Sequence, residues 1–358
     1  MTLDELRRYT VARTLFPPTT LSRALTRLGF VQADPIRAPA RAQDLTLRHR
    51  VRNYRAGDLE RRYGSLPVEE DVLVNYGFVA RHVQALMHPR SRGVARKAAV
   101  RRRTEALLAF VRSRGVVHPR EVDAHFAHGV VTNYWGGSSS ATTHLLDDMH
   151  YRGLLRVVRR DAGIRLYAAR QHAAGPADAG ARDARLDALV DVVVRVYGPL
   201  PRATLAWLVN RLRYAVPQWQ RQLKPALRRA LRRLSHAHIQ GVDWFWPPDE
   251  PVAQAVEPTV RLLAPFDPLV WDRRRFELLW WWSYRFEAYT PVAKRKLGYY
   301  ALPMLWGDRV IGWANLAVAD GTLVSKLDYV RGEPADGLFK AELDAELHRM
   351  RQFLGVSD

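Results

Sequence analysis

The stretch from residue 104 to residue 172 has the most regular secondary-structure pattern in the chain, and it restricts the folds open to that segment. Helices are expected over Thr104–Arg114 and Arg120–Phe126. The serine run Ser138–Ser140 precedes a third helical pattern over Ala141–Arg152, and serine hydroxyls are preferred at the first position of a helix. The segment therefore begins with three helices in succession.

A β-hairpin is expected to follow these helices. The runs Leu154–Arg160 and Ile164–Ala168 are typical of short strands, and the turn signal Asp161-Ala162-Gly163 lies between them. Three helices followed by a two-stranded hairpin predict a winged helix, the variant of the helix-turn-helix in which the hairpin forms the wing. The Ala/Gly-rich stretch Ala173–Ala181 after it is typical of a linker.

Two other segments show related patterns. Residues 182–250 repeat the order less regularly, with a hairpin expected over Ala237–Trp246. The helices expected before this hairpin are Leu186–Tyr197, Arg202–Leu212 and Gln218–Ser235. Residues 1–103 begin with a helix over Leu3–Leu15 and a second one that Thr19 or Thr20 caps and Gly29 ends.

The pattern changes to strands after Thr259. The expected strands are Val260–Ala264, Tyr284–Tyr289, Tyr299–Trp306, Val310–Val318 and Thr322–Tyr329. Helices are expected from Asp272 and over Ala335–Phe353. The predicted fold is therefore α+β, with three tandem winged-helix domains at 1–103, 104–172 and 182–250 and a C-terminal antiparallel β-barrel domain at 255–358.

Composition restricts the class of protein. A hydrophobic fraction of 47% over 358 residues is enough for several cores, which excludes a wholly disordered chain. The chain contains no cysteine, which excludes disulfides, thiol nucleophiles and cysteine-ligated zinc or iron–sulfur sites. The first ten residues lack the apolar core of a secretory signal, so a cytoplasmic, nucleoid-associated protein is expected.

Charge indicates the kind of partner. The chain carries 56 Lys and Arg against 36 Asp and Glu, a formal net charge of +20. The segments Arg81–Arg103 and Arg211–Arg233 each contain 8 basic residues and no acidic one. Binding of such segments to nucleic acid is favoured because each neutralised phosphate releases condensed counterions. Nucleic acid is the expected partner, with a membrane surface or an acidic protein as the alternative.

Motifs for several chemistries are missing from the sequence. It contains no P-loop, no dinucleotide-binding glycine fingerprint and no G-x-S-x-G elbow. The histidines His125, His128, His144 and His150 have no acidic or thiol partners at helical ligand spacing, so neither a metal nor a cofactor is expected.

Gln32 and Asp34 are the candidate catalytic pair. At i and i+2 of an extended segment, their side chains point the same way. The carboxylate could accept a proton from a water that the amide orients, or stabilise an oxocarbenium ion. The structural alternative is that Asp34 makes a turn before Pro35 while Gln32 bonds to the backbone. The two residues alone leave both interpretations open.

Four stretches together resemble one family of bacterial enzymes. Gly29–Ile36 (GFVQADPI) contains Gln32 and Asp34, and Leu262–Arg275 (LLAPFDPLVWDRRR) is followed by Tyr284–Glu287 (YRFE) and Pro291–Tyr300 (PVAKRKLGYY). These stretches are similar to the opening motif and the barrel signature of the AlkZ/YcaQ (AlkX) winged-helix DNA glycosylases. The Gln-x-Asp form resembles the YcaQ branch.

This resemblance implies an activity as well as a fold. It implies a monofunctional DNA glycosylase that hydrolyses the N-glycosidic bond of alkylated bases, N7-alkylpurines above all, and that acts on interstrand crosslinks. It also implies that Gln32 and Asp34 are catalytic and that double-stranded DNA is the partner. A monomer is expected, since nothing in the sequence demands a dimer. The alternatives are a non-catalytic winged-helix DNA-binding protein or regulator, and a nuclease. The nuclease is disfavoured because the sequence lacks a carboxylate cluster for two metal ions.

Basic residues near the two motifs and on the predicted wing are the candidate DNA contacts. They are Arg37, Arg41, Arg159, Arg160, Arg165, Lys294, Arg295 and Lys296. For the three wing arginines, the alternative is a solvated basic hairpin.

Overall fold

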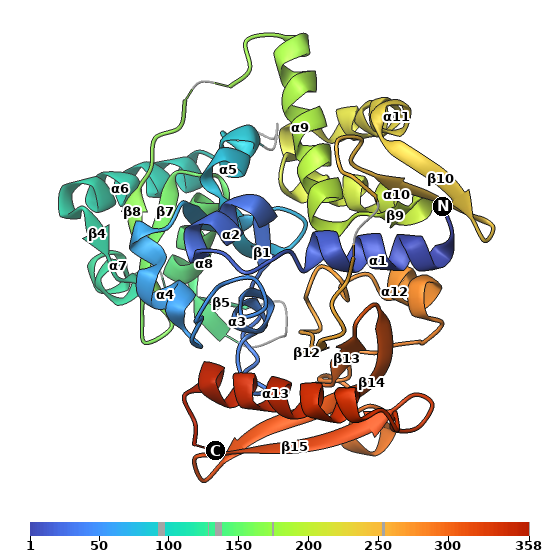
Figure 1. Cartoon of the computed structure of the whole chain (residues 1–358). Coiled ribbons are helices and arrows are strands. Elements are labelled where there is room, and N and C mark those ends of the chain that lie inside the picture. The colour runs from blue at the N-terminus through green and yellow to red at the C-terminus, as the bar shows by residue number, and fades with distance from the viewer. Residues whose placement is uncertain (92–96, 128, 133–137, 174, 253–254, 358) are drawn as a thin grey trace. The chain divides into compact units, whose positions relative to one another are not determined.

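The structure is a computed structural model (Figure 1), and it describes residues 1–91, 97–127, 129–132, 138–173, 175–252 and 255–357. These residues form two compact units. Unit 1 comprises Met1–Leu59, Val190–Leu208 and Leu227–Asp358, and unit 2 comprises Glu60–Leu189 and Val209–Ala226. The four domains expected from the sequence stay a prediction.

Unit 1 begins with two capped helices. Helix α1 (Leu3–Thr14) starts with a capping box, in which the Thr2 hydroxyl accepts the Glu5 N–H at 3.2 Å and the Glu5 carboxylate accepts the Thr2 N–H at 2.7 Å. Helix α2 (Leu21–Leu28) is capped by Thr20 and ends at Gly29, whose φ of 71° favours glycine. Strand β1 (Phe30–Gln32) and helix α3 (Ala42–Leu47) follow.

The middle of the chain supplies a small sheet to unit 1. Its strands are β9 (Leu200–Pro201), β10 (Ser235–Ile239) and β11 (Val242–Trp246), in the order β10-β11-β9. The helices next to these strands along the chain are α9 (Ala179–Tyr197), α10 (Arg202–Arg211) and α11 (Leu223–Arg233), and each of them is divided between the two units. Helix α9 begins inside the stretch expected to be a linker, so that expectation was wrong for Ala179–Ala181. Helix α11 is shorter than predicted because a 3₁₀ segment, Pro217–Gln222, precedes it.

The C-terminal sheet is open, so the prediction of a β-barrel was wrong. Its strands are β12 (Val260–Leu262), β13 (Leu302–Trp306), β14 (Arg309–Ala319) and β15 (Thr322–Tyr329), antiparallel in this order. Helix α13 (Gly337–Leu354) lies against the sheet (Figure 1). Its buried Phe339 packs on Trp306 and Tyr329, at 5.3 and 6.1 Å between ring centroids. The strands therefore do not close into a barrel, and helix α13 covers the open sheet instead.

The strand expected over Tyr284–Tyr289 is also absent, since this stretch has no regular secondary structure. Tyr284 is buried and donates its hydroxyl to the Ala301 carbonyl at 2.7 Å. Buried Glu287 accepts the backbone N–H groups of Lys296 and Leu297 at 2.8 and 2.7 Å. The polar groups of this stretch thus bind loops instead of a neighbouring strand.

The core of unit 1 joins its N- and C-terminal parts. Leu6 of α1 and Trp244 of β11 belong to the same buried cluster as Phe276 of α12 (Arg273–Trp280). A fully buried ion pair lies in the same unit, where Arg50 donates to both carboxylate oxygens of Asp267 at 2.7 and 2.9 Å. Segments more than 200 residues apart in sequence therefore fold together.

Unit 2 begins with a hairpin that contains buried acids. Strands β2 (Val68–Val72) and β3 (Tyr76–Ala80) are antiparallel, with α4 (Asp58–Arg62) before them and α5 (Arg81–Met87) after them. Glu69, Glu70 and Asp71 of β2 are all buried, and arginines pair with each of them. Part of the chain's arginines is therefore engaged in ion pairs inside the protein, because a buried carboxylate is costly unless it is paired.

The rest of unit 2 has the order of elements expected over residues 104–172. The helices are α6 (Ala98–Arg114), α7 (Pro119–Phe126) and α8 (Ala141–Tyr151), and α6 starts six residues earlier than expected. The strands are β4 (Val116–Val117), β5 (Val130–Thr132), β6 (Ser138–Ser140), β7 (Leu155–Asp161) and β8 (Ile164–Ala169). Strands β4, β8 and β7 form one sheet in that order. Within the described residues, no helix is long and apolar enough to cross a membrane.

Candidate active site

The Gln32–Asp34 segment leaves the core of unit 1 at the end of β1. Phe30 and Val31 are buried and anchor the strand, whereas Gln32 and Asp34 are half-buried. The Asp34 carboxylate accepts the Ile36 N–H at 2.9 Å, and the Asp34 N–H donates to Oε1 of Gln43 in α3 at 3.2 Å. The turn named above as the structural alternative for Asp34 is therefore present, and it fixes one carboxylate oxygen of Asp34.

Gln32 is oriented by a tryptophan from the C-terminal part of the chain. The indole N–H of Trp271 donates to Oε1 of Gln32 at 2.7 Å. An indole can only donate, so this bond directs the amide oxygen of Gln32 to Trp271, and the amide NH₂ on the other side of the group can only donate. Trp271 lies in the stretch Leu262–Arg275, but no role for it can be predicted from the sequence, because no local pattern links residues 239 positions apart.

Aromatic rings surround Trp271. Tyr197, at the end of α9, lies 4.8 Å from it between ring centroids, and Trp207 of α10 lies at 5.4 Å. Trp207 is 48% exposed, which is unusual for so large an apolar ring. A hydrogen bond of 2.6 Å from Thr204 to Asp272 connects α10 to the residue after Trp271. The candidate site is therefore bounded on one side by aromatic rings that are partly open to solvent.

Burial controls the electrostatics of Asp34. Desolvation raises the pKa of the Asp34 carboxyl above its ordinary 3.8, and the Ile36 N–H opposes this by stabilising the anion. The pKa of the Tyr300 hydroxyl is raised by burial and by the negative charge of nearby Asp34. The Tyr300 hydroxyl is buried without a hydrogen-bond partner among the described residues. Tyr300 was not predicted as a site residue either, although it ends the stretch Pro291–Tyr300.

The candidate DNA contacts of unit 1 lie in two loops. Arg37 is exposed, and Arg41, half-buried, pairs with it through the backbone just before α3. Lys294 and Lys296 are exposed on the loop that Glu287 binds. Arg295 donates to the Thr290 carbonyl at 2.8 Å and stacks over the Tyr299 ring at 5.1 Å. The first loop follows the segment with Gln32 and Asp34, and the second loop precedes Tyr300.

The three candidates on the predicted wing of unit 2 differ in their contacts. Arg159 is exposed, whereas Arg160 donates to both Glu70 carboxylate oxygens at 2.9 and 2.6 Å. Arg165 pairs with Asp147 at 3.0 Å and lies over the Tyr76 ring at 5.5 Å. Two of the three guanidinium groups thus bind within the unit.

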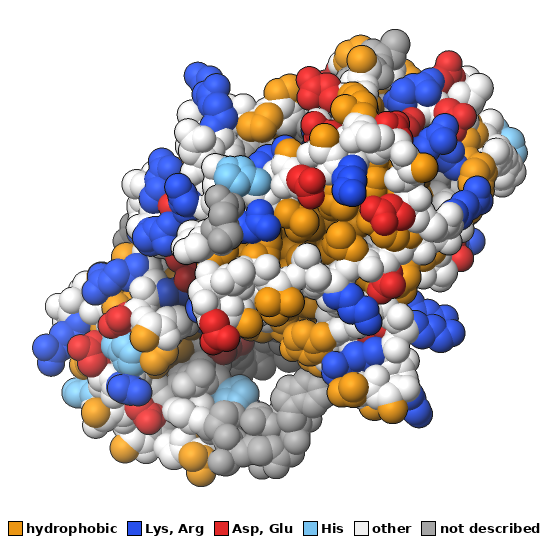
Figure 2. Space-filling model, turned by 60° about the horizontal axis from the view of Figure 1, so that its bottom comes forward, with side chains coloured by type: hydrophobic (Ala, Val, Ile, Leu, Met, Phe, Trp, Pro, Cys, Tyr) orange, Lys and Arg blue, Asp and Glu red, His pale blue; other side chains and the backbone are white. Residues whose placement is uncertain are grey.

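Basic side chains are not confined to these loops. On the face that Figure 2 shows, Lys and Arg side chains lie at many separate points with acidic ones between them, so the positive charge is spread over this face.

Metal ligands were considered at the sequence level around four histidines, of which His128 lies outside the described residues. The described part of the chain contains no group of three or more His, Cys, Asp or Glu side chains that could hold a metal ion.

Comparison with known proteins gives two findings. Residues 25–353 match the family described as DNA glycosylase AlkZ-like. Among solved structures, the chain is similar to the Streptomyces sahachiroi DNA glycosylase AlkZ, with a TM-score of 0.65 and 15% sequence identity over 100% of this chain and 98% of that chain. At this identity, the structural likeness shows a shared mixed α/β fold, and the family match covers most of the chain.

Proposed function

Since the chain belongs to the AlkZ-like DNA glycosylase family, and therefore hydrolyses the N-glycosidic bond of bases in alkylated DNA, we propose that its substrates are N7-alkylpurines and that Gln32 and Asp34 catalyse their release. The observation that carries this proposal is the Trp271–Gln32 hydrogen bond, which orients an amide on the same extended segment as a half-buried carboxylate. Interstrand crosslinks made through N7 are the second proposed substrate.

The leaving group explains why one carboxylate suffices. Alkylation at N7 makes a purine cationic, so it departs as a neutral base without protonation by a general acid. The remaining task is to activate a water and to stabilise the positive charge that develops on the sugar. Asp34 can do both, because the Ile36 N–H binds only one of its two carboxylate oxygens.

Gln32 places the water for this reaction. With its oxygen on Trp271, the amide NH₂ donates a hydrogen bond to the water oxygen, and the water donates one of its protons to Asp34. One lone pair of the water then remains for attack on the anomeric carbon. Trp207, 48% exposed beside Trp271, supports a site open enough for bulky or crosslinked adducts.

Double-stranded DNA is the proposed partner, bound by a monomer in the cytoplasm through three winged helices. The exposed residues Arg37, Lys294, Lys296 and Arg159, together with Arg41 and Arg295, are the proposed phosphate contacts. Arg160 and Arg165 shape the wing through Glu70 and Asp147, and their remaining N–H groups add to phosphate binding.

A base-release assay tests this function. Duplex DNA with N7-methylguanine, or with a nitrogen-mustard crosslink, is incubated with the protein and then heated in alkali, which cleaves abasic sites. Strand breaks at the modified guanine are expected from the first substrate, and separation of the strands from the second. Tight binding to both duplexes without base release would instead favour a non-catalytic DNA-binding protein.

Replacing Trp271 by Phe is expected to slow base release about fivefold, because a hydrogen bond of about 1 kcal/mol no longer orients Gln32. Single-turnover rates and DNA affinity are measured together, and only the rates are expected to fall. Trp281→Phe is the control, since Trp281 is 62% exposed. Equal rates for both variants would contradict a positioning role for Trp271.

The acidic limb of the pH profile is expected to follow Asp34. The carboxylate is the active form, so the rate falls as pH drops through the pKa of Asp34, and burial places that pKa above 3.8. Single-turnover rates from about pH 4 to about pH 8 with saturating DNA, corrected for spontaneous depurination, measure the midpoint. A rate that stays constant down to the ordinary pKa of an exposed carboxyl would contradict this assignment.

A further inference from the structure

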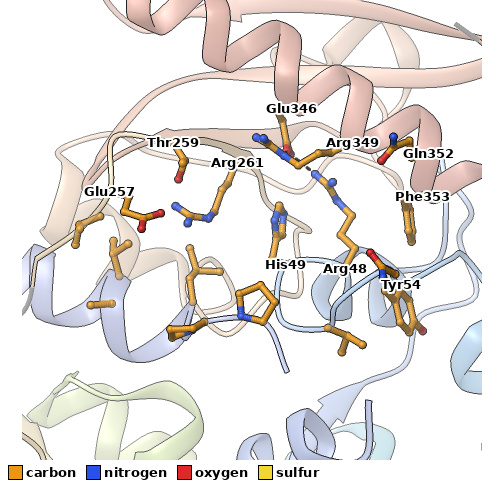
Figure 3. A pocket seen from close by; sticks show the side chains of 18 of the residues that line it. Arg48, His49, Tyr54, Glu257, Thr259, Arg261, Glu346, Arg349, Gln352 and Phe353 are labelled. Carbon is orange, nitrogen blue, oxygen red and sulfur yellow. Dashed lines mark hydrogen bonds and ion pairs between the residues drawn. The ribbon is translucent and has the colours of Figure 1, made fainter. Parts of the chain in front are cut away.

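A cavity of about 730 Å³ in unit 1 contains none of the residues of the candidate active site. Its wall is formed by the end of α1, the segment from Arg48 to Arg55, strand β12 and helix α13 (Figure 3). Gln32, Asp34, Trp271 and Tyr300 are absent from its lining. Base release therefore does not account for this cavity.

The cavity is positively charged. Four arginines line it against two glutamates, Glu257 and Glu346, which leaves a net charge of +2 (4 − 2). Glu346 is already neutralised, since it pairs with Arg48 and with Nε of Arg349, the latter at 3.1 Å, and accepts the Leu262 N–H at 2.9 Å. Figure 3 shows Glu346 between the two guanidinium groups.

Two polar groups in the wall lack partners. Nε of Arg48 and the hydroxyl of Thr259 are buried, and neither has a hydrogen-bond partner among the described residues. The Arg48 side chain is only 4% exposed. A buried donor left unpaired is costly, and a bound acceptor would remove that cost.

Arg261 of β12 is the third donor. Its guanidinium makes no hydrogen bond or ion pair within the described part of the chain, although burial lowers its pKa by disfavouring the charged form. Exposed Glu257 attracts it without forming an ion pair, and Figure 3 shows the two side chains on the same side of the cavity. An unpaired, partly desolvated guanidinium favours an anionic ligand.

We propose that this cavity binds a phosphomonoester attached to a small organic body, of the nucleoside monophosphate class. A phosphomonoester has a charge of nearly −2 and three acceptor oxygens, which match the net charge and the free donors of Arg48, Arg261 and Thr259. The volume exceeds that of a phosphate ion. Val11, Leu15, Pro17 and Val256 supply an apolar surface for the rest of the ligand.

Calorimetric titration of the full chain at low salt tests this site. The probes are deoxyadenosine monophosphate, deoxyadenosine, inorganic phosphate and a 5′-phosphorylated dinucleotide beside its unphosphorylated form. Binding of deoxyadenosine monophosphate without binding of deoxyadenosine is expected. Tighter binding of the phosphorylated dinucleotide than of the mononucleotide would identify a DNA strand end as the source of the phosphate, and the reverse order a free nucleotide.

Variants assign the binding to the cavity. Arg261→Gln is expected to weaken binding of deoxyadenosine monophosphate at least about tenfold, and Thr259→Val several-fold. Arg309→Gln removes the same charge from an exposed position at the start of β14, and binding of deoxyadenosine monophosphate is expected to stay unchanged. All three variants should keep base release, which separates this proposal from the proposed function. Absence of binding by every phosphate-bearing probe, or equal binding by Arg261→Gln and Arg309→Gln, would overturn it.

Discussion

Asp34→Asn is expected to reduce base release from N7-methylguanine DNA at least about 100-fold, because a general base contributes factors of about 10² to 10⁴. The asparagine carbonyl can still accept the Ile36 N–H, so the turn after β1 should persist. The variant removes the negative charge that both activates water and stabilises the cationic sugar. DNA affinity should stay equal or rise, since a carboxylate near phosphates opposes binding.

The decisive comparison is between single-turnover rate and duplex affinity for the same preparation. Asp320→Asn is a matched control, because Asp320 is exposed in the turn between β14 and β15 and its φ of 51° suits asparagine. Full activity in Asp34→Asn would remove Asp34 from the mechanism and leave the glycosylase activity of the family without an assigned base. Loss of both binding and activity would indicate a folding defect.

Local signals explain what could be predicted from sequence. The hairpin β7–β8 was predicted from Asp161-Ala162-Gly163, whose positive φ values at Ala162 and Gly163 are those of a tight turn. Ser140 caps α8 as expected, accepting the N–H groups of Thr142 and Thr143. Both features depend on residues within a few positions of each other, and such spacing is visible in a sequence.

Contacts between distant residues explain what could not be predicted. The sequence analysis placed Gln32 and Asp34 on one extended segment, and the structure adds that Trp271 reaches Gln32. The Tyr284–Tyr289 stretch has a strand-like composition, yet Tyr284 and Glu287 bind the loop that follows. Strand propensity describes a fit to a half-buried surface, and tertiary contacts override it there.

The Arg50–Asp267 pair gives the second large effect, this time on stability. Both side chains are fully buried, and Arg50 also donates to the carbonyls of Thr14 and Thr46 at 2.9 and 2.6 Å. Asp267→Asn leaves this guanidinium without a countercharge. The free energy of unfolding is therefore expected to fall by about 3–5 kcal/mol. Asp249→Asn, which breaks the exposed Arg195–Asp249 pair of similar length, should cost less than about 1 kcal/mol.

Denaturant unfolding followed by tryptophan fluorescence and circular dichroism measures both variants. The backbone carbonyl of Asp267 accepts the backbone N–H of Trp271 at 2.8 Å, so a shift of this segment in Asp267→Asn should also slow base release by displacing Trp271 from Gln32. The double variant Arg50→Met with Asp267→Leu removes both charges and should regain most of the lost stability, because an apolar pair of similar volume often replaces a buried ion pair at no net cost. A double variant as unstable as Asp267→Asn would show that the hydrogen bonds from Arg50 to Thr14 and Thr46 contribute more to stability than the ion pair itself.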